Sequence, residues 1–333
     1  MNTARTTELT TTQLTSTQLT TTPLSTTQMT AGSVTSRDGT TIGYLRVGHG
    51  PAVVLLHGSM ESARSHTRLA LSLADAFTVY LPDRRGRGMS GPYRPDHGLR
   101  TEVEDLDAVL AESGARLVFG VSAGGLAALE AARTRPAIRK VAVYEPALLM
   151  DAAWPTDWIS RFDQELTQGN TAAALITSMY GFGLAPPVFR LMPRRLLESL
   201  TRLGMNREDK KAGADTVTMR QLAPTLRYEG RLLAETAGTI GTLAGMPADV
   251  LLLGGSKGLP DLKPALDALA QTLPRSRRVE FPGLDHGGSS DASSTNPGGG
   301  KPEIVAREIR VFFAQQGSPA GPRHETAAGG STA

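Results

Sequence analysis

Short apolar runs alternate with amphipathic stretches from about residue 34 to residue 316. Runs such as 53–56 (VVLL) and 250–253 (VLLL) show no polar alternation, which is typical of strands buried on both faces of a parallel sheet. With a hairpin signal at Asp38-Gly39, they predict strands over 34–36, 41–47, 52–56, 77–81, 116–121, 139–144, 249–253 and 277–281. Helical periodicity predicts helices over 63–76, 100–111, 123–133, 262–273 and 303–315. The repeated strand–helix order predicts an α/β fold with a mostly parallel, doubly wound sheet, whose core is formed by 34–146 and 246–317.

One interval, 147–245, has helical periodicity and no clear strand. It is too long for a simple crossover, so it predicts an inserted helical cap. Its large apolar residues either form a small helical core or face a substrate; they are Trp154, Trp158, Phe162, Met179, Tyr180, Phe182, Phe189 and Met192.

The two ends of the chain differ from this core. Fourteen of the first thirty residues are threonine, and one apolar residue recurs every five positions from Leu9 to Met29. A five-residue step forms no apolar face on a helix or a strand, so 1–33 is predicted to be a disordered leader. The polar, Gly-rich segment 318–333 is predicted to be a disordered tail.

Composition excludes several classes of protein. The 333 residues include no cysteine, which excludes disulfides, cysteine-ligated metals and a thiol nucleophile. The net charge is only +3 and the basic residues are scattered, so nucleic acid is not an expected partner. No apolar stretch is long enough to span a membrane, and no secretory signal is visible, so a cytoplasmic location is expected. The oligomeric state is left open.

Two segments match G-x-S-x-G, a pattern that is weak alone. Ser122 follows an apolar strand and directly precedes the helix former AGGLAALEAAR, as a strained nucleophile on a strand-to-helix turn requires. Ser256 also follows a strand, but Gly258, Leu259 and Pro260 come next and predict a loop. Ser122 is therefore the candidate nucleophile.

A serine nucleophile needs a neighbouring base. Of six histidines, four precede Ser122 and His324 lies in the tail. Only His286, in FPGLDHGG, follows a late strand from which a loop could reach the carboxyl edge of the sheet.

The segments LLHGS (55–59), DRRGRGMS (83–90), GVSAGG (120–125) and PGLDHGG (282–288) together resemble the α/β-hydrolase family of serine hydrolases, over about residues 34–316. The resemblance implies the triad order nucleophile, acid, histidine, with Ser122 and His286 in two of these roles. It also implies an oxyanion hole formed by the backbone N–H groups of Ser59 and Ala123. For His57 a structural role is expected rather than proton transfer.

Two further features of this pattern leave alternatives open. The arginines Arg84, Arg85 and Arg87 are expected to form a solvated, hydrogen-bonded loop, the alternative being attraction of anionic substrates. Most relatives place the acid just after the strand that follows the cap, where this chain has Gly258. Glu145, at the end of the strand after the Ser122 helix, is the preferred substitute, as in haloalkane dehalogenase-like relatives. The alternatives are Asp261 and a missing acid; Asp285 adjoins His286 and is disfavoured.

The expected function is hydrolysis of an ester, thioester or lactone bond of a small hydrophobic substrate through an acyl-enzyme. The resemblance implies no metal or organic cofactor. The alternatives are C–C hydrolysis, acyl transfer or cofactor-free perhydrolysis with the same triad, or a weakly catalytic ligand receptor.

Overall fold

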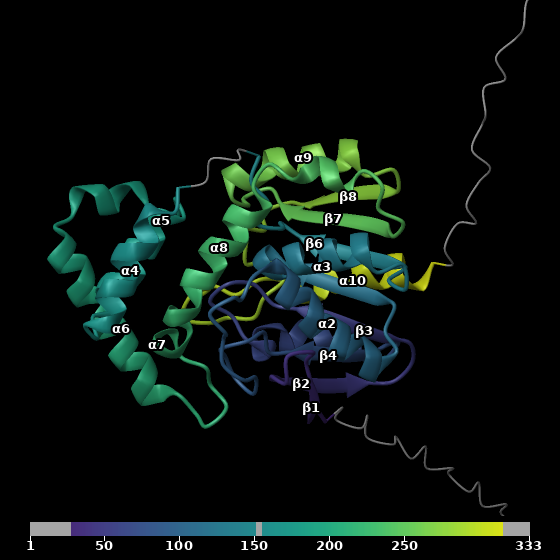
Figure 1. The fold of residues 1–333 in the computed structure, drawn as a ribbon, viewed down its shortest axis with the longest axis horizontal. Helices are drawn as coiled ribbons and strands as arrows, with labels where there is room; N and C mark the ends of the chain where they lie inside the picture. The colour runs from purple at the N-terminus through teal and green to yellow at the C-terminus, as the bar shows by residue number, and fades with distance from the viewer. Residues whose placement is uncertain (1–27, 151–154, 316–333) are drawn as a thin grey trace, which may run out of the picture.

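Eight strands form one sheet in the computed structural model, which describes residues 28–150 and 155–315 (Figure 1). The order is β1-β2-β4-β3-β5-β6-β7-β8. The β1–β2 and β2–β4 pairs are antiparallel and the other neighbours are parallel. The strands are β1 (Thr30–Thr35), β2 (Thr41–Gly48), β3 (Ala52–Leu56), β4 (Thr78–Pro82), β5 (Leu117–Val121), β6 (Lys140–Tyr144), β7 (Asp249–Gly255) and β8 (Ser276–Phe281). This confirms the predicted α/β class with a mostly parallel sheet.

Helices cover both faces of the sheet. On one face lie α2 (Leu99–Ser113), α3 (Ser122–Thr134) and α9 (Lys263–Thr272), which follows the short 3₁₀ helix η5 (Pro260–Leu262). On the other lie α1 (Thr67–Leu71) and α10 (Pro302–Ala314). Successive strand residues such as Val53 and Val54 therefore enter different apolar clusters, and both are fully buried. Burial on both faces explains why the central strands carry no polar alternation.

Two element boundaries differ from the prediction by more than two residues. The first strand begins at Thr30, so the predicted leader boundary at 33 is too late. Because β1 is an edge strand paired only with β2, its backbone hydrogen bonds order residues that have little apolar character. The predicted helix 63–76 is a 3₁₀ turn, η1 (Ala63–His66), followed by α1, which ends at Leu71. His66 separates the two because its backbone is not helical (φ −123°, ψ 26°).

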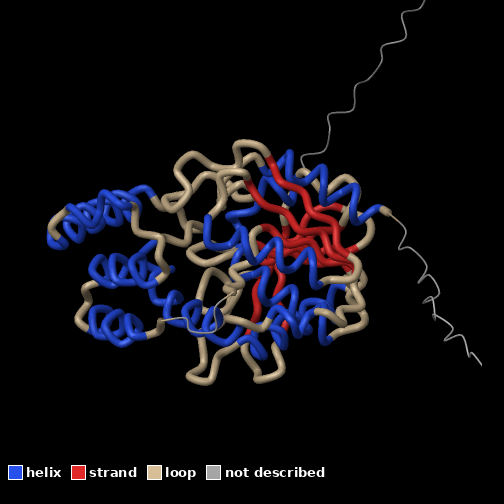
Figure 2. Tube along the Cα trace, turned by 90° about the horizontal axis from the view of Figure 1, so that it is seen from above, coloured by secondary structure: helices blue, strands red, loops and turns tan. Residues whose placement is uncertain are grey.

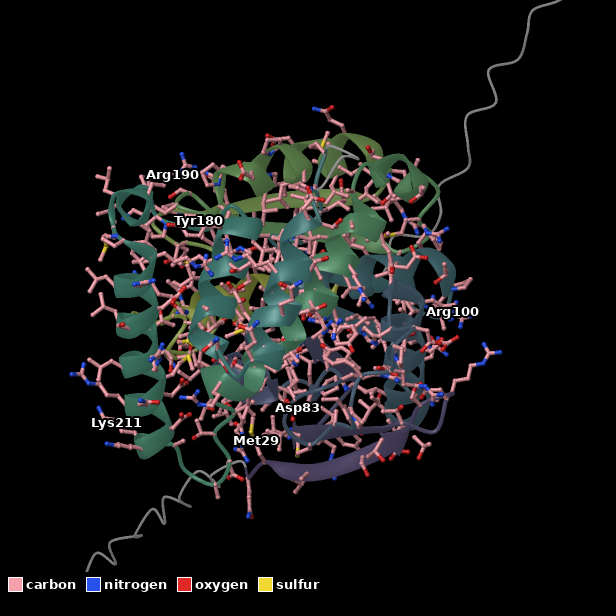
Figure 3. All side chains as sticks on the ribbon, turned by 60° about the vertical axis from the view of Figure 1, so that its left-hand side comes forward. Met29, Asp83, Arg100, Tyr180, Arg190 and Lys211 are labelled. Atoms are coloured by element: carbon pink, nitrogen blue, oxygen red, sulfur yellow. The ribbon has the colours of Figure 1, made fainter. Side chains whose placement is uncertain are left out.

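The interval 147–245 consists of helices and the loops that connect them, with no strand among its described residues. It contains α4 (Asp157–Thr167), α5 (Thr171–Gly181), α6 (Arg194–Lys211), α7 (Met219–Leu222), α8 (Leu226–Thr236) and the 3₁₀ turns η2 (Pro187–Leu191), η3 (Ala223–Thr225) and η4 (Ile240–Leu243). Figure 1 shows α4, α5 and α6 standing away from the sheet, with α8 between them and the core, and Figure 2 shows helices on the same side, separated from the strands. In Figure 3, Arg190 and Lys211 lie on the outer edge of this helical insertion, away from Asp83 of the core. Whether the insertion acts as a cap over a substrate remains a prediction.

Most of the predicted leader, all of the predicted tail (318–333) and Trp154 lie outside the described residues. Within the described ranges, no helix combines the length and the apolar character needed to cross a bilayer.

Candidate active site

Ser122 lies at the junction of β5 and α3 with a left-handed backbone, φ 51°. The junction is tightly packed: a Cβ at Gly120 would lie 2.5 Å from the Gly124 carbonyl oxygen, and one at Gly124 would lie 2.5 Å from that of His57. Only glycine fits at these two positions, which lets the backbone turn sharply from strand to helix. A non-glycine residue in this conformation is strained, and strain of this kind is typical of functional sites. The geometry matches the one predicted for a nucleophile.

Glu145 and His286 meet at the carboxyl edge of the sheet. Glu145 follows β6 and is 1% exposed, and its Oε2 lies 2.8 Å from Nδ1 of His286. Its carboxylate also accepts the backbone N–H groups of Gly255 (2.8 Å) and Leu259 (3.3 Å). Burial alone would raise the pKa of Glu145, but the hydrogen bond and charge of His286 and the two amides outweigh it and lower the pKa. Glu145 is thus held ionised beside the imidazole.

The Glu145 carboxylate occupies the space that a side chain at 258 would take. A Cβ added to Gly258 would lie 1.8 Å from Oε1 of Glu145. The left-handed backbone of Glu145 (φ 40°) turns its side chain out of the strand direction at this point. Asp261, the alternative acid, is exposed in η5, and no hydrogen bond joins it to His286 among the described residues. The structure therefore brings Glu145, and not Asp261, to the histidine.

The loop that carries His286 is fixed to the same strand end. The buried hydroxyl of Tyr144 donates to the Asp285 carbonyl at 2.7 Å, directly before His286. His286 is 29% exposed, so its ring is reachable from solvent. Within the described residues, Ser122 Oγ is not hydrogen-bonded to this ring. Catalytic hydrogen bonds are often long without substrate and shorten when it binds.

The turn after β3 lies against Ser122. A Cβ at Gly58 would lie 3.1 Å from Ser122 Cβ. Met60, two residues further along this turn, has a left-handed backbone (φ 54°). The Ser59 N–H has no acceptor among the described residues. The Ala123 N–H lies in the first turn of α3, where amides lack partners within the helix. Both predicted oxyanion donors are thus unengaged.

His57 is buried with both ring nitrogens engaged. Nδ1 lies 2.9 Å from the Gly58 carbonyl oxygen, and Nε2 accepts the Arg84 N–H at 3.0 Å. Burial, then the charges of Arg87 and Arg84, lower the pKa of His57 well below its usual value, so the ring stays neutral. No ring nitrogen is left to transfer a proton, in agreement with the expected structural role.

A buried pair beside the turn, Glu61 and His66, was not singled out from the sequence. Glu61 Oε2 accepts the Gly58 N–H at 2.7 Å and lies 3.2 Å from His66 Nε2, and Oε1 accepts the Ser290 hydroxyl at 2.5 Å. His66 Nδ1 faces the Ser289 carbonyl oxygen at 3.2 Å. The pair thus ties the turn to the loop of His286. Ser289 and Ser290 lie more than 220 residues further along the chain than the pair, so the sequence spacing did not reveal these contacts.

His66 should make the stability of the protein depend on pH. Both its ring nitrogens face acceptors that cannot donate, so the ring is an imidazolium; burial alone would lower the pKa, but Glu61 raises it above 6.5. Burial alone would raise the pKa of Glu61, but His66 lowers it to about 2. Because the pKa of His66 is raised on folding, its contribution to the folded state is complete below pH 6.5 and is lost as the pH rises through the folded-state pKa. Because the pKa of Glu61 is lowered on folding, its contribution is present above pH 4.5 and is lost as the pH falls through the folded-state pKa.

We expect His66→Gln to lose about 3 kcal/mol of unfolding free energy near pH 6, because it leaves a buried carboxylate without its cation. The deficit should shrink between pH 6 and pH 9, measured by urea unfolding at each pH. His49→Gln, at an exposed position, is the matched control. A deficit that is equal at both pH values would contradict the imidazolium assignment.

The three arginines of the 83–90 loop are not solvated, contrary to expectation. Arg84, Arg85 and Arg87 are 3%, 0% and 3% exposed. Four carboxylates from distant elements reach them: Asp38, Glu102, Asp105 and Glu229. These partners lie far away in the sequence, so spacing did not reveal them. Paired and buried guanidinium groups are also poorly placed to attract an anionic substrate.

Two features of the insertion lie close to these loops. Met60, in the turn after β3, packs against an insertion cluster formed by Phe162, Ala174 and Leu226, with Trp158 and Phe182 around it. A cavity of about 540 Å³ lies between core loops and the segment 214–217 of the insertion. Its lining includes Ser62, Arg64, Asp83, Arg87, Met89, Ser90, Pro92 and Gln221, but none of the three triad candidates. The insertion thus contributes apolar packing against the turn after β3 and one wall of a mixed polar cavity beside the 83–90 loop.

Comparison with known sequences places this geometry among hydrolases. A family model described as "Alpha/beta hydrolase family" matches residues 53–294, which is most of the chain. A pimeloyl-[acyl-carrier protein] methyl ester esterase of Xanthomonas campestris pv. campestris (strain B100) is 35% identical over 111 residues, covering 33% of this chain and 43% of the relative. The namesake from Stenotrophomonas maltophilia (strain R551-3) is 31% identical over 160 residues, covering 45% of this chain and 61% of the relative. The matches thus span less than two thirds of these curated relatives.

Solved structures show a similar fold. An α/β hydrolase from Sphaerobacter thermophilus DSM 20745 has a TM-score of 0.66 and 29% identity, over 85% of this chain and all of the other. The esterase RhEst1 from Rhodococcus sp. ECU1013 has a TM-score of 0.57 and 20% identity, over 86% of this chain and 99% of the other. These likenesses agree with the predicted α/β-hydrolase fold.

Proposed function

Because the chain belongs to the α/β-hydrolase family, we propose that it hydrolyses an ester-type bond of a small hydrophobic substrate through an acyl-enzyme on Ser122. The observation that carries the proposal is the 2.8 Å contact between the buried Glu145 carboxylate and His286 Nδ1. It supplies the oriented base that a serine hydroxyl needs at neutral pH.

In the proposed first step, Ser122 Oγ attacks the acyl carbon while His286 Nε2 takes the hydroxyl proton. Glu145 accepts the Nδ1–H, which selects the tautomer with a free Nε2 and stabilises the imidazolium that forms. The Ser59 and Ala123 amides bind the negative charge that develops on the carbonyl oxygen. The imidazolium then gives its proton to the leaving alcohol, and the acyl-enzyme remains.

In the second step, His286 takes a proton from water, and the hydroxide formed attacks the acyl carbon. The tetrahedral intermediate collapses, the proton returns to Ser122 Oγ, and the acid is released. Attack by serine rather than by a carboxylate argues against the alkyl-enzyme chemistry of haloalkane dehalogenases and epoxide hydrolases in this fold.

The relatives are methyl ester esterases by name, which supports an ester as the substrate class. The apolar cluster around Phe162 and Met60 supports a hydrophobic acyl or alcohol group. Thioesters and lactones are the nearest other substrate classes. Adding an alcohol or a peroxide to compete with water for the acyl-enzyme would reveal acyl transfer or perhydrolysis. C–C bond hydrolysis would be tested separately with a β-diketone. A missing acid at 258 would favour a receptor, but the Glu145 carboxylate fills this space and supports an enzyme instead.

The test is a series of p-nitrophenyl esters of increasing acyl length, together with intact-mass labelling by a fluorophosphonate. We expect multiple turnovers and a single adduct on the wild-type protein. Binding of these esters without turnover, and no adduct, would overturn the proposal and favour a receptor.

A further inference from the structure

We infer that Arg87 is a positioning residue for the oxyanion hole and that Glu229 of α8 anchors it, so that the helical insertion sets the orientation of the Ser59 N–H. This inference rests on the proposed function. It concerns neither the nucleophile nor its base, but the peptide unit whose N–H would stabilise the negative charge on the substrate carbonyl oxygen.

The peptide bond between Gly58 and Ser59 is the object that Arg87 holds. Arg87 Nη1 donates to the Gly58 carbonyl oxygen at 3.2 Å. A trans peptide is planar, with its C=O and N–H groups pointing in opposite directions. Fixing the carbonyl on the Arg87 side therefore fixes the Ser59 N–H on the other side. That N–H has no acceptor among the described residues.

A second donor holds the same carbonyl. His57 Nδ1 lies 2.9 Å from the Gly58 oxygen, and the Arg84 N–H donates to Nε2 of this ring. Because Nε2 accepts, the proton of the neutral ring is on Nδ1, which donates to Gly58. Two donors in different directions leave the carbonyl little freedom to rotate.

Arg87 is itself fixed by the insertion. Its Nη2 donates to Glu229 Oε1 at 2.5 Å and to the Tyr93 hydroxyl at 2.8 Å. Glu229 is 0% exposed and also binds Arg84 at 3.1 Å. Burial alone would raise the pKa of Glu229, but Arg84 and Arg87 lower it, so the carboxylate is ionised. The chain of contacts thus runs from α8 through Glu229 and Arg87 to the Gly58–Ser59 peptide.

The charge of Arg87 adds to its geometric effect. A cationic donor on a carbonyl polarises the peptide, which strengthens the N–H at the other end as a donor. Glu229 balances the charge, so the guanidinium remains buried without a large penalty. An uncharged donor at 87 would orient the peptide but polarise it less.

The experiment compares two charge-balanced double variants on a p-nitrophenyl ester. Arg87→Met/Glu229→Gln removes the anchored donor together with its counter-charge, so neither member of this pair is left as an unpaired buried charge. Arg85→Met/Asp105→Asn removes a neighbouring, equally buried pair (2.6 Å) that does not contact Gly58. We expect the first variant to lose about 10- to 100-fold in kcat with KM nearly unchanged, since loss of a whole oxyanion donor costs 10²–10³-fold. The second should keep its kcat, although both are expected to unfold at lower temperature.

Affinity for an alkyl boronic acid, which forms a tetrahedral adduct with the serine, is the second readout. This affinity should fall in parallel with kcat in the first variant only, while KM stays nearly unchanged. A merely structural change would weaken adduct binding and raise KM together. Arg87→Lys should recover part of kcat, because it keeps a cationic donor. Equal kcat losses in both double variants, or unchanged boronate affinity in the first, would overturn the role of Arg87. A wild-type protein without turnover or fluorophosphonate adduct would instead defeat the proposed function itself.

Discussion

Replacing Ser122 by alanine should abolish ester hydrolysis, with kcat falling by about 10⁴-fold or more. The residual rate would come from the oxyanion amides and from binding alone. The fold should persist, because Ser122 Oγ forms no hydrogen bond with the described residues and alanine is the smaller side chain at a tightly packed junction. Steady-state kinetics on a p-nitrophenyl ester and fluorophosphonate labelling would measure the loss.

Ser256→Ala is the matched control, since Ser256 lies in the second G-x-S-x-G segment. Its exposed hydroxyl accepts the Gly283 N–H at 2.8 Å, so it serves as a loop contact. We expect this variant to keep its kcat and its adduct. Labelling that persists in Ser122→Ala but disappears in Ser256→Ala would show that Ser256, and not Ser122, is the nucleophile.

The second large effect is expected at Glu145. Glu145→Gln should lower kcat by about 10²- to 10⁴-fold, because the amide can neither stabilise the imidazolium nor select the tautomer with Nε2 free. Asp261→Asn, at the other candidate acid, should keep its activity since Asp261 is exposed and forms no hydrogen bond with His286 among the described residues. A kcat that falls in Asp261→Asn and not in Glu145→Gln would reverse the assignment.

A swap of the acid between strand ends tests the same site more sharply. Gly258→Asp alone should be destabilised, because its Cβ would meet the Glu145 carboxylate at 1.8 Å. Glu145→Ala/Gly258→Asp clears that space and places a carboxylate where most relatives carry it. We expect the double variant to regain part of the kcat that Glu145→Ala loses. A double variant as inactive as Glu145→Ala would show that the space above Gly258 does not position an acid toward His286.

Local pattern was sufficient for most of the fold. Strands buried on both faces must be apolar throughout, and amphipathic helices must alternate with them, so the central strands β3 to β7 could be predicted from the sequence. The strand-to-helix turn at Ser122 was also readable, because its small neighbours are required by close backbone packing within the turn itself. The loop of His286 could be placed by its position after a late strand.

Where the pattern failed, a long-range contact was the cause. The first strand depends on pairing with β2, and the break at His66 accompanies its contacts with Glu61 and Ser289. Neither leaves a trace in local hydrophobicity. The arginine loop was expected in solvent for the same reason, since Glu229, which neutralises Arg84 and Arg87, lies some 140 residues further along the chain.

The α/β class, the helical insertion and the candidates Ser122 and His286 could therefore be predicted from the amino-acid sequence, because each follows from the order of residues along one element. It left the acid open between Glu145 and Asp261, because both follow strands or turns that can reach the same edge. The carboxylate that contacts His286 could be identified only in the folded chain, since this contact depends on the left-handed backbone at Glu145 and on the space left by Gly258. Side chains from separate strands meet only when the sheet is assembled, and their contacts are a property of the assembled sheet.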